Sequence, residues 1–386
     1  MNRVCSIFSQ LLQLFPRSEF EQAVRRHHAE REARGFTCLG QFIAMLFCQL
    51  GRAHSLREIT QGLAASEGKL KHLGLTAAPN KSTLAYANQH RPWQLYQTVL
   101  FQLLARCQAL AADRKRPFRF KNKLVSLDAT VIDLCLSLYD WAAFRRAKGA
   151  IKLHLLLDHD GYLPSFAHLT EGKTHEIVVA RRLRLEPGTI VVFDRGYTDY
   201  EWFLRLTAER VWFVTRMKHN ADYVVVEKRA LPPGTAIRSD EVISTFQHAR
   251  QEKEVFFRRI VVWDESAQRE LVFLTNHLGF AASTIAAIYK ERWQIELFFK
   301  ALKQLCKIKS FVGTSANAVK TQVWTALIAM LLLRFLQLKA SFGWALSNLL
   351  ALLRQQLFVY RDLWTWLNQP FQPPPPPPAE QLALIY

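Results

Sequence analysis

Cysteine pairs with the spacing of a metal site are missing from this sequence. It contains six cysteines, and none of them forms a Cys-x-x-Cys pair, so no zinc site is predicted. Most of them stand in apolar surroundings, which is typical of buried free thiols. Free thiols persist in a reducing compartment, and we expect the protein to work in one.

Long hydrophobic runs are also missing. The longest apolar stretch, Val323–Leu333, ends at Arg334 and has about half of the ~20 residues that a membrane-spanning helix needs. It predicts a buried helix instead. The N-terminal segment has a short apolar stretch without a small-residue cleavage site, so no signal peptide is predicted. We therefore expect no membrane partner.

Acidic residues are few relative to basic ones. The 386-residue chain has 51 Lys and Arg against 32 Asp and Glu, a net charge of +19 and a pI near 9.9. Such an excess favours polyanionic partners, because phosphates that bind basic side chains release condensed counterions. An ordinary basic protein is the alternative that charge alone leaves open.

Residues 1–112 have the pattern of helices. A capping box begins at Ser55: its hydroxyl can bond a free backbone N–H while Glu58 reaches back. A second helix start is expected with Ser82 as its cap. Two short helices joined by a glycine-containing connector could form a helix-turn-helix-like DNA reader, with the helix Ser82–Arg91 on the DNA. A plain helical bundle would look similar.

A basic segment, Arg114–Lys123, follows the helices and carries Phe118 and Phe120 between its charges. Such a segment can lie along phosphates and offer rings for stacking. A solvated linker between domains is an equally good interpretation.

From residue 124 onward the pattern changes to strands. Leu124–Thr130 predicts a strand that ends near Asp128, the Asp160–Gly161 pair predicts a hairpin, and Thr189–Asp194 predicts a buried strand. The order of strands and helices predicts a mixed α/β sheet covered by helices. The expected parts are a helical N-terminal DNA-binding domain (1–112), a basic linker (113–123), a first part of the core (124–222), a β-rich insertion (223–275), a second part of the core (276–345), and a C-terminal helical segment with a proline-rich tail (346–386).

Three carboxylates are candidates for a metal site. Asp128 and Asp194 are each expected at the end of an apolar strand, at the sheet rim where function often lies in α/β folds. With Glu296 they could converge, and divalent cations would then have to neutralise their repulsion. Oxygen ligands favour Mg²⁺ or Mn²⁺, and a pair of such ions about 4 Å apart supports phosphoryl transfer. Simple turn-capping aspartates are the alternative.

Four polar residues, Tyr289, Arg292, Glu296 and Lys303, are spaced so that one continuous helix would present them on a single side. An ordinary ion pair explains Arg292 and Glu296, but it leaves Tyr289 and Lys303 on the same line unexplained. Arginine can hold a phosphate through two hydrogen bonds and lysine can supply a point charge, so the stripe suits a phosphodiester. The opposite side is expected to be core and carries Ile288, Ile295, Phe299 and Leu302.

These positions form a Tyr-x2-Arg-x3-Glu-x6-Lys signature. By it the sequence resembles the acid-triad (DDE) transposases of bacterial insertion sequences, and in particular the family of insertion sequence four. The strings SLDAT, Ser126–Thr130, and FDRGY, Phe193–Tyr197, resemble the family's motifs at the first and second acid. The resemblance covers residues 120 to about 340, and the helical N-terminus is similar to the leading domain of one branch.

The resemblance implies an RNase H-like catalytic core with a β-strand insertion. It implies that Asp128, Asp194 and Glu296 are catalytic and hold two Mg²⁺ ions, with Mn²⁺ as a substitute. Tyr289, Arg292 and Lys303 are then expected to contact DNA at the cleaved transposon end.

Three further residues are candidate DNA contacts. Family members use an insertion-domain tryptophan to stack on a flipped base, for which Trp263 is the candidate; core packing is the alternative. Arg216 and Lys218 end a strand near the inferred site, where a phosphate contact and a solvated rim are equally good interpretations.

The implied function is metal-dependent DNA cleavage at insertion-sequence ends followed by strand transfer into target DNA. The expected partners are the terminal inverted repeats, the target duplex and a second copy of the chain, in a bacterial cytoplasm at the nucleoid. A metal-dependent nuclease without strand transfer and a non-catalytic, transposase-derived DNA-binding protein are the alternatives. A glycosidase that uses two of the carboxylates is disfavoured by the charge and the stripe.

Overall fold

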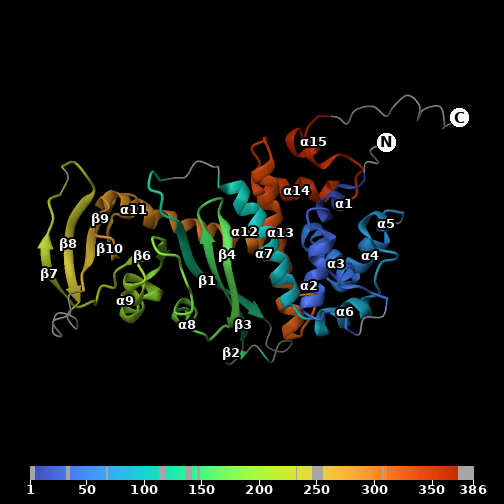
Figure 1. Cartoon of the computed structure of the whole chain (residues 1–386), viewed down its shortest axis with the longest axis horizontal. Coiled ribbons are helices and arrows are strands. Elements are labelled where there is room, and N and C mark those ends of the chain that lie inside the picture. Colours follow the sequence, from blue (N-terminus) through green and yellow to red (C-terminus); the bar gives the residue numbers. More distant parts are fainter. Residues whose placement is uncertain are drawn as a thin grey trace. The chain divides into compact units, whose positions relative to one another are not determined.

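The computed structural model describes residues 5–31, 35–66, 68–112, 118–134, 141, 143–145, 148–231, 233–245, 255–306, 308 and 310–372 (Figure 1). Residues 113–117 of the basic linker, Cys135 and the proline run 373–378 lie outside them. The chain forms two compact units, one of residues 1–110 with 301–386 and one of residues 111–300. The stretch 276–345, expected to belong to the core, is thus divided between the two units.

The first unit is helical in its described residues, as the pattern of residues 1–112 predicts. Its N-terminal helices are α1 (Ile7–Leu12), α2 (Arg17–Arg26), α3 (Cys38–Gly51), α4 (Leu56–Ala64), α5 (Leu70–Leu73), α6 (Lys81–His90) and α7 (Gln94–Ala111). The C-terminal ones are α13 (Ala316–Lys339), α14 (Leu346–Gln356) and α15 (Leu363–Asn368).

The centre of this unit is the apolar helix α13, which packs against α3, α6 and α14. By length and composition alone α13 could cross a membrane, but 89% of its most apolar window is buried inside the protein. It is therefore a core helix, as Val323–Leu333 predicts. The thiols of Cys38, Cys48, Cys107 and Cys306 are free and buried, which confirms that part of the prediction.

Local capping explains where two of these helices begin. The Ser55 hydroxyl accepts the Glu58 N–H at 3.1 Å, and the Glu58 carboxylate accepts the His54 N–H at 2.9 Å, so the capping box is confirmed. The predicted cap Ser82 is wrong. α6 begins at Lys81, and Asn80 occupies the N-cap position. Ser82 is therefore an exposed residue inside the first turn.

The second unit contains one sheet, ten-stranded in the residues that the structure describes. Its strands are β1 (Leu124–Leu134), β2 (Ala143–Arg145), β3 (Lys148–Asp158), β4 (Leu163–Glu171), β5 (Ile190–Phe193), β6 (Trp212–Arg216), β7 (Tyr223–Lys228), β8 (Ile237–Thr245), β9 (Phe257–Asp264) and β10 (Arg269–Thr275). Its helices are α8 (Glu176–Ala180), the 3₁₀ helix η2 (Arg195–Tyr197), α9 (Tyr200–Ala208), α11 (Ala282–Glu291) and the start of α12 (Trp293–Leu305).

The strand order defines the fold of this unit. β4, β3 and β1 form an antiparallel meander, and β1, β5 and β6 follow side by side and parallel. This is the RNase H-like arrangement, as expected. The hairpin between β3 and β4 turns at Gly161, whose φ of +84° favours glycine. The predicted β-rich insertion is the antiparallel series β10, β9, β8 and β7, which extends the same sheet beyond β6.

Asp128 does not stand at a strand end, so that expectation is wrong. β1 continues to Leu134 because β3 pairs with it from Val125 to Leu134. The parallel pairing of β1 with β5, however, stops at Leu127 opposite Phe193. Asp128 and Asp194 are the next residues on the two strands, and both therefore lie where the parallel ladder ends.

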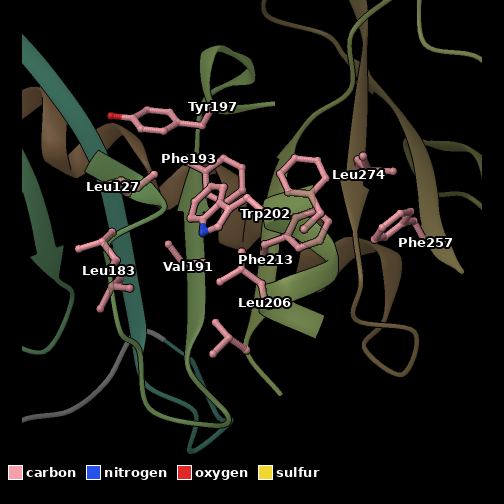
Figure 2. Close-up of a cluster of buried hydrophobic side chains, with 14 of the residues drawn as sticks. Leu127, Leu183, Val191, Phe193, Tyr197, Trp202, Leu206, Phe213, Phe257 and Leu274 are labelled. Carbon is pink, nitrogen blue, oxygen red and sulfur yellow. The ribbon is translucent and has the colours of Figure 1, made fainter. Parts of the chain in front are cut away.

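Helices cover the two faces of this sheet. Figure 2 shows Val191, Phe193 and Phe213 of the sheet packed against Trp202 and Leu206 of α9. On the other face the main apolar contacts come from α11, and that cluster contains Leu124, Val192, Val214, Ile285 and Ile288. Side chains alternate along a strand, so Ser126, Asp128 and Asp194 follow Leu124 and Val192 on the α11 face.

The expected single helix through the four-residue signature is also wrong in one respect. α11 ends at Glu291 and α12 begins at Trp293. Around the break the Arg292 N–H donates to the Tyr289 carbonyl, and the Ile295 N–H donates to the Arg292 carbonyl, both at 3.1 Å. These are three-residue steps, tighter than those of an α-helix, and such tightening often marks a functional position.

Candidate active site

Two of the three predicted acids are held by backbone hydrogen bonds at the end of the parallel ladder. An Asp128 carboxylate oxygen accepts the N–H of Ala129, and one of Asp194 accepts the N–H of Gly196, each at 2.8 Å. A Cβ at Gly196 would lie 2.9 Å from that Asp194 oxygen. A side chain in place of the glycine of the FDRGY string would therefore displace the Asp194 carboxylate.

The third acid reaches the site through an arginine. The Arg292 guanidinium lies between two carboxylates: Nη1 is 3.5 Å from Asp128 and Nη2 is 2.5 Å from Glu296. Its side chain is only 14% exposed. Because Arg292 occupies the break between α11 and α12, one cation connects β1 to the first turn of α12.

The pKa of Asp128 is shifted mainly by burial, with smaller contributions from its charged neighbours. Burial raises this pKa from 3.8 to about 7, the Ala129 N–H and the Arg292 guanidinium lower it, and the charges of Asp194 and Glu296 raise it further. Burial is the largest of these effects, and it outweighs the Ala129 hydrogen bond and the Arg292 charge together. The charges of Asp194 and Glu296 are thus near enough to Asp128 to act on its pKa.

An aromatic and cationic wall adjoins the acids. The Tyr289 ring packs on Phe273 with ring centroids 5.0 Å apart, and the Arg292 guanidinium lies 5.7 Å from the centre of the Tyr289 ring. Burial raises the pKa of Tyr289, and the charges of Arg292 and Arg216 lower it. Arg216 ends β6 beside Asp194, so the structure brings Tyr289, Arg292 and Arg216 together with the acids.

Other predicted DNA contacts are placed differently. Lys303 lies in the last turn of α12, within the helical unit, and Lys218 is exposed beyond the end of β6. Trp263 follows Val262, which belongs to the α11-side cluster, so alternation turns its ring to the opposite face of the sheet. There the Arg238 guanidinium lies 6.0 Å from the Trp263 ring centre. The structure does not bring Trp263 together with the acids, and its role stays a prediction.

The donor chemistry of the site fits a divalent cation. Three carboxylates offer only hard oxygen ligands, the kind that Mg²⁺ and Mn²⁺ prefer. Among the described residues no group of three His, Cys, Asp or Glu side chains is arranged to hold a metal ion; Arg292 instead binds two of the acids. The oxygen donors of Asp128, Asp194 and Glu296 are therefore chemically suited to such an ion.

One polar cluster near the site was not predicted. The Ser126 hydroxyl lies 2.7 Å from Nε2 of His159, and Nδ1 of His159 lies 3.6 Å from the Glu291 carboxylate. Periodicity could have indicated Ser126, because it shares a strand face with Asp128. No local pattern singles out His159, which lies beside the hairpin signal Asp160–Gly161, or Glu291, which lies beside the signature residue Arg292.

Comparison with known protein families agrees with this geometry. Residues 119–332, more than half of the chain, match a family described as the Transposase DDE domain. Residues 4–76 match a domain of unknown function, DUF4372. The chain therefore belongs to the DDE transposase family, which confirms the resemblance seen in the signature of residues 289–303.

Three proteins with similar sequences are each named as transposases. A Sinorhizobium fredii protein named as transposase y4zB is 32% identical over 261 residues, which cover 67% of this chain and 71% of the relative. A Geobacillus stearothermophilus protein named as the transposase for insertion sequence element IS5377 is 27% identical, covering 66% and 67%. A Synechocystis protein named as the transposase for element IS4SA is 26% identical, covering 68% and 73%.

Among solved structures, the synaptic complex of the piggyBac transposase with hairpin DNA is similar at a TM-score of 0.46 and 9% identity. The match covers 99% of this chain and 84% of that one.

Proposed function

We propose that this DDE transposase cleaves DNA at the ends of an insertion sequence and joins the freed 3′-hydroxyl to a target duplex. The observation that supports this most is that Arg292 bridges Asp128 of β1 and Glu296 of α12, while Asp194, the residue after β5, is near enough to act on the pKa of Asp128. Oxygen-only donors of this kind would hold Mg²⁺ or Mn²⁺, which when bound activates an attacking oxygen and stabilises a leaving one.

The protein side chains beside the acids suit the DNA backbone. Arg292 offers a planar fork of donors that matches a phosphate, and Arg216 lies next to Tyr289 at the same sheet end. The proposal is that these cations orient the scissile phosphate while the Tyr289 ring packs against the nucleotide. Lys218, Lys303 and Trp263 would contact DNA further from the reacting atoms.

The net charge of +19 supports a polyanionic partner. We include in the proposal that the helical unit binds the terminal inverted repeats, that two copies of the chain pair two ends, and that the protein works at the bacterial nucleoid.

A cleavage assay tests the proposal. The substrate is duplex DNA carrying the sequences that flank this gene, with Mg²⁺ or Mn²⁺, and the protein is wild type, Glu296→Gln or Glu270→Gln. The last variant is the matched control because Glu270 is an exposed residue of β10. We expect wild type and Glu270→Gln to cut at the end and Glu296→Gln to bind DNA without cutting.

Two other outcomes would replace the proposal. Cutting without joined products would indicate the nuclease that lacks strand transfer. Binding by all three proteins, with no cutting in either metal ion, would indicate the non-catalytic DNA-binding protein.

A further inference from the structure

A buried polar relay joins β1 to the end of α11. Ser126 is completely buried and His159 is 4% exposed, and the Ser126 hydroxyl lies 2.7 Å from His159 Nε2. On the other side of the ring, Nδ1 lies 3.6 Å from an oxygen of Glu291, to which the Tyr162 hydroxyl donates at 3.5 Å. The close approach of the His159 ring, at 3.6 Å, is the main reason why the pKa of Glu291 is lowered.

The order serine, imidazole, carboxylate resembles the nucleophilic machinery of hydrolases. Here that role is excluded by burial, because Ser126 points from the middle of a sheet into the core and no substrate carbonyl can reach its oxygen. The relay must therefore act on its neighbours in the protein.

Those neighbours are the active-site residues on both sides. Ser126 stands two positions before Asp128 on the same face of β1, and Glu291 immediately precedes Arg292 at the break between α11 and α12. The His159 N–H also donates to the Leu124 carbonyl at 3.0 Å, so the backbone of His159 is attached to β1.

We propose that His159 is a positioning residue, which holds the α11–α12 break against β1 and thereby sets the distance between Glu296 and Asp128. This inference rests on the proposed function, because the effect is expected on the chemistry of that site.

Polar contacts are needed here because the apolar ones cannot set this distance alone. Ile285 and Ile288 bury α11 against the sheet, but hydrophobic contact is non-directional and permits small shifts of the helix along the sheet. Polar contacts to a buried ring and a hydroxyl are directional, and Glu291, the last residue before the break, makes two of them, with His159 at 3.6 Å and with Tyr162 at 3.5 Å. A shift there moves Arg292 and Glu296 together relative to Asp128.

His154 provides a matched control. Its ring is also fully buried in β3, and its Nε2 also lies 2.9 Å from a hydroxyl, that of Thr170. His154 pairs with Ala129, however, so it faces away from α11. His159→Phe and His154→Phe therefore each remove a buried imidazole and one hydroxyl contact, and only the first cuts the connection to Glu291.

The experiment compares the full-length wild type, His159→Phe and His154→Phe. It measures single-turnover cleavage of the terminal DNA, the dissociation constant of Mn²⁺ by electron paramagnetic resonance, DNA affinity, and thermal unfolding. We expect His159→Phe to cleave about 10- to 100-fold more slowly and to bind Mn²⁺ more weakly, as with other residues that orient metal ligands. DNA affinity should stay within about threefold, and His154→Phe should keep the wild-type cleavage rate.

A rescue pair separates positioning from general stability. Glu291→Gln keeps an oxygen that can accept the Nδ1 proton of His159 and should cleave within about threefold of wild type. Glu291→Ala removes the acceptor and should fall to the level of His159→Phe. Equal losses in His159→Phe and His154→Phe, or a wild-type rate in Glu291→Ala, would overturn the inference.

The Mn²⁺ measurement distinguishes this inference from the proposed function. If the wild type binds Mn²⁺ but does not cut DNA, the proposed function fails and the inference is judged by Mn²⁺ affinity alone. A wild type that binds no Mn²⁺ would overturn both.

Discussion

The Arg292 guanidinium lies 3.5 Å from the Asp128 carboxylate, although 164 residues separate the two in the chain. The contact places a protein cation on an acid that is expected to bind a divalent ion. If Asp128 holds a divalent ion, as proposed, Arg292 and that ion would compete for the same carboxylate oxygens, and the guanidinium would become available for a DNA phosphate.

Removal of Arg292 should therefore change how much a bound metal ion stabilises the protein. We expect Arg292→Ala to lose about 1–3 kcal/mol of stability without metal, because a buried carboxylate loses its partner. Saturating Mn²⁺ should stabilise the variant more than the wild type, since no side chain competes with the ion. Chemical denaturation with and without Mn²⁺ measures both effects. If Mn²⁺ raised the free energy of unfolding equally in the two proteins, competition between Arg292 and the ion would be contradicted.

Asp128 should make the stability of the metal-free protein depend on pH. Its pKa is about 7 in the folded chain against an ordinary value of 3.8. Between about pH 4 and pH 7 the folded state thus holds a proton that the unfolded state has lost, so stability falls as the pH rises through this window. At pH 8 we expect Asp128→Asn to be more stable than wild type by about 1–3 kcal/mol, and at pH 4 nearly equal.

Urea denaturation in the presence of a chelator measures this dependence. The control is Asp133→Asn, an exposed aspartate of the same strand, which should follow the wild-type curve. If Asp128→Asn gained no stability relative to wild type between pH 4 and pH 8, the raised pKa would be wrong.

The β-rich insertion should depend on one buried ion pair. Arg258 and Asp240 join β9 to β8 through two contacts of 2.7 Å and 2.5 Å, with side chains 4% and 7% exposed. Either Arg258→Met or Asp240→Leu leaves a buried charge without its partner and should cost about 3–5 kcal/mol. The double variant should lose clearly less free energy of unfolding than the two single variants lose together. A double-mutant cycle by chemical denaturation measures the coupling, and purely additive losses would count against it.

Helix caps give a prediction that separates the structure from the sequence pattern. Ser55→Ala removes the side-chain acceptor at the start of α4 and should lower the free energy of unfolding by about 1 kcal/mol. Ser82→Ala should be nearly neutral, because Ser82 lies inside the first turn of α6. Thermal unfolding compares the two variants. Equal losses of stability would indicate that Ser82 does cap α6.

Much of the second unit could be predicted from the sequence. The buried strand before Asp194, the hairpin at Asp160–Gly161 and the strands of the insertion all depend on local alternation and turn chemistry. The signature from Tyr289 to Lys303 depends on spacing alone. These features lie within short stretches of chain, which is why periodicity detects them.

The errors have a common physical cause. β1 runs past Asp128 because β3 pairs with it over its whole length, and no local pattern encodes that pairing. The break between α11 and α12 lies at Arg292, whose guanidinium contacts a distant strand, and no local pattern encodes that contact. The face of the sheet that carries the Trp263 ring likewise depends on how β9 pairs with its neighbours, and the role of this residue stays a prediction.

The sequence by itself determined the class of protein and the helical nature of the N-terminal part, and it predicted three candidate acids, because motif spacing and hydrophobic periodicity are properties of neighbouring residues. Only the tertiary structure decided that Arg292 is shared between Asp128 and Glu296, and that Ser126, His159 and Glu291 form a relay behind them. Those contacts join residues far apart in the chain, and their geometry depends on strand register and helix packing, which the folded core alone defines.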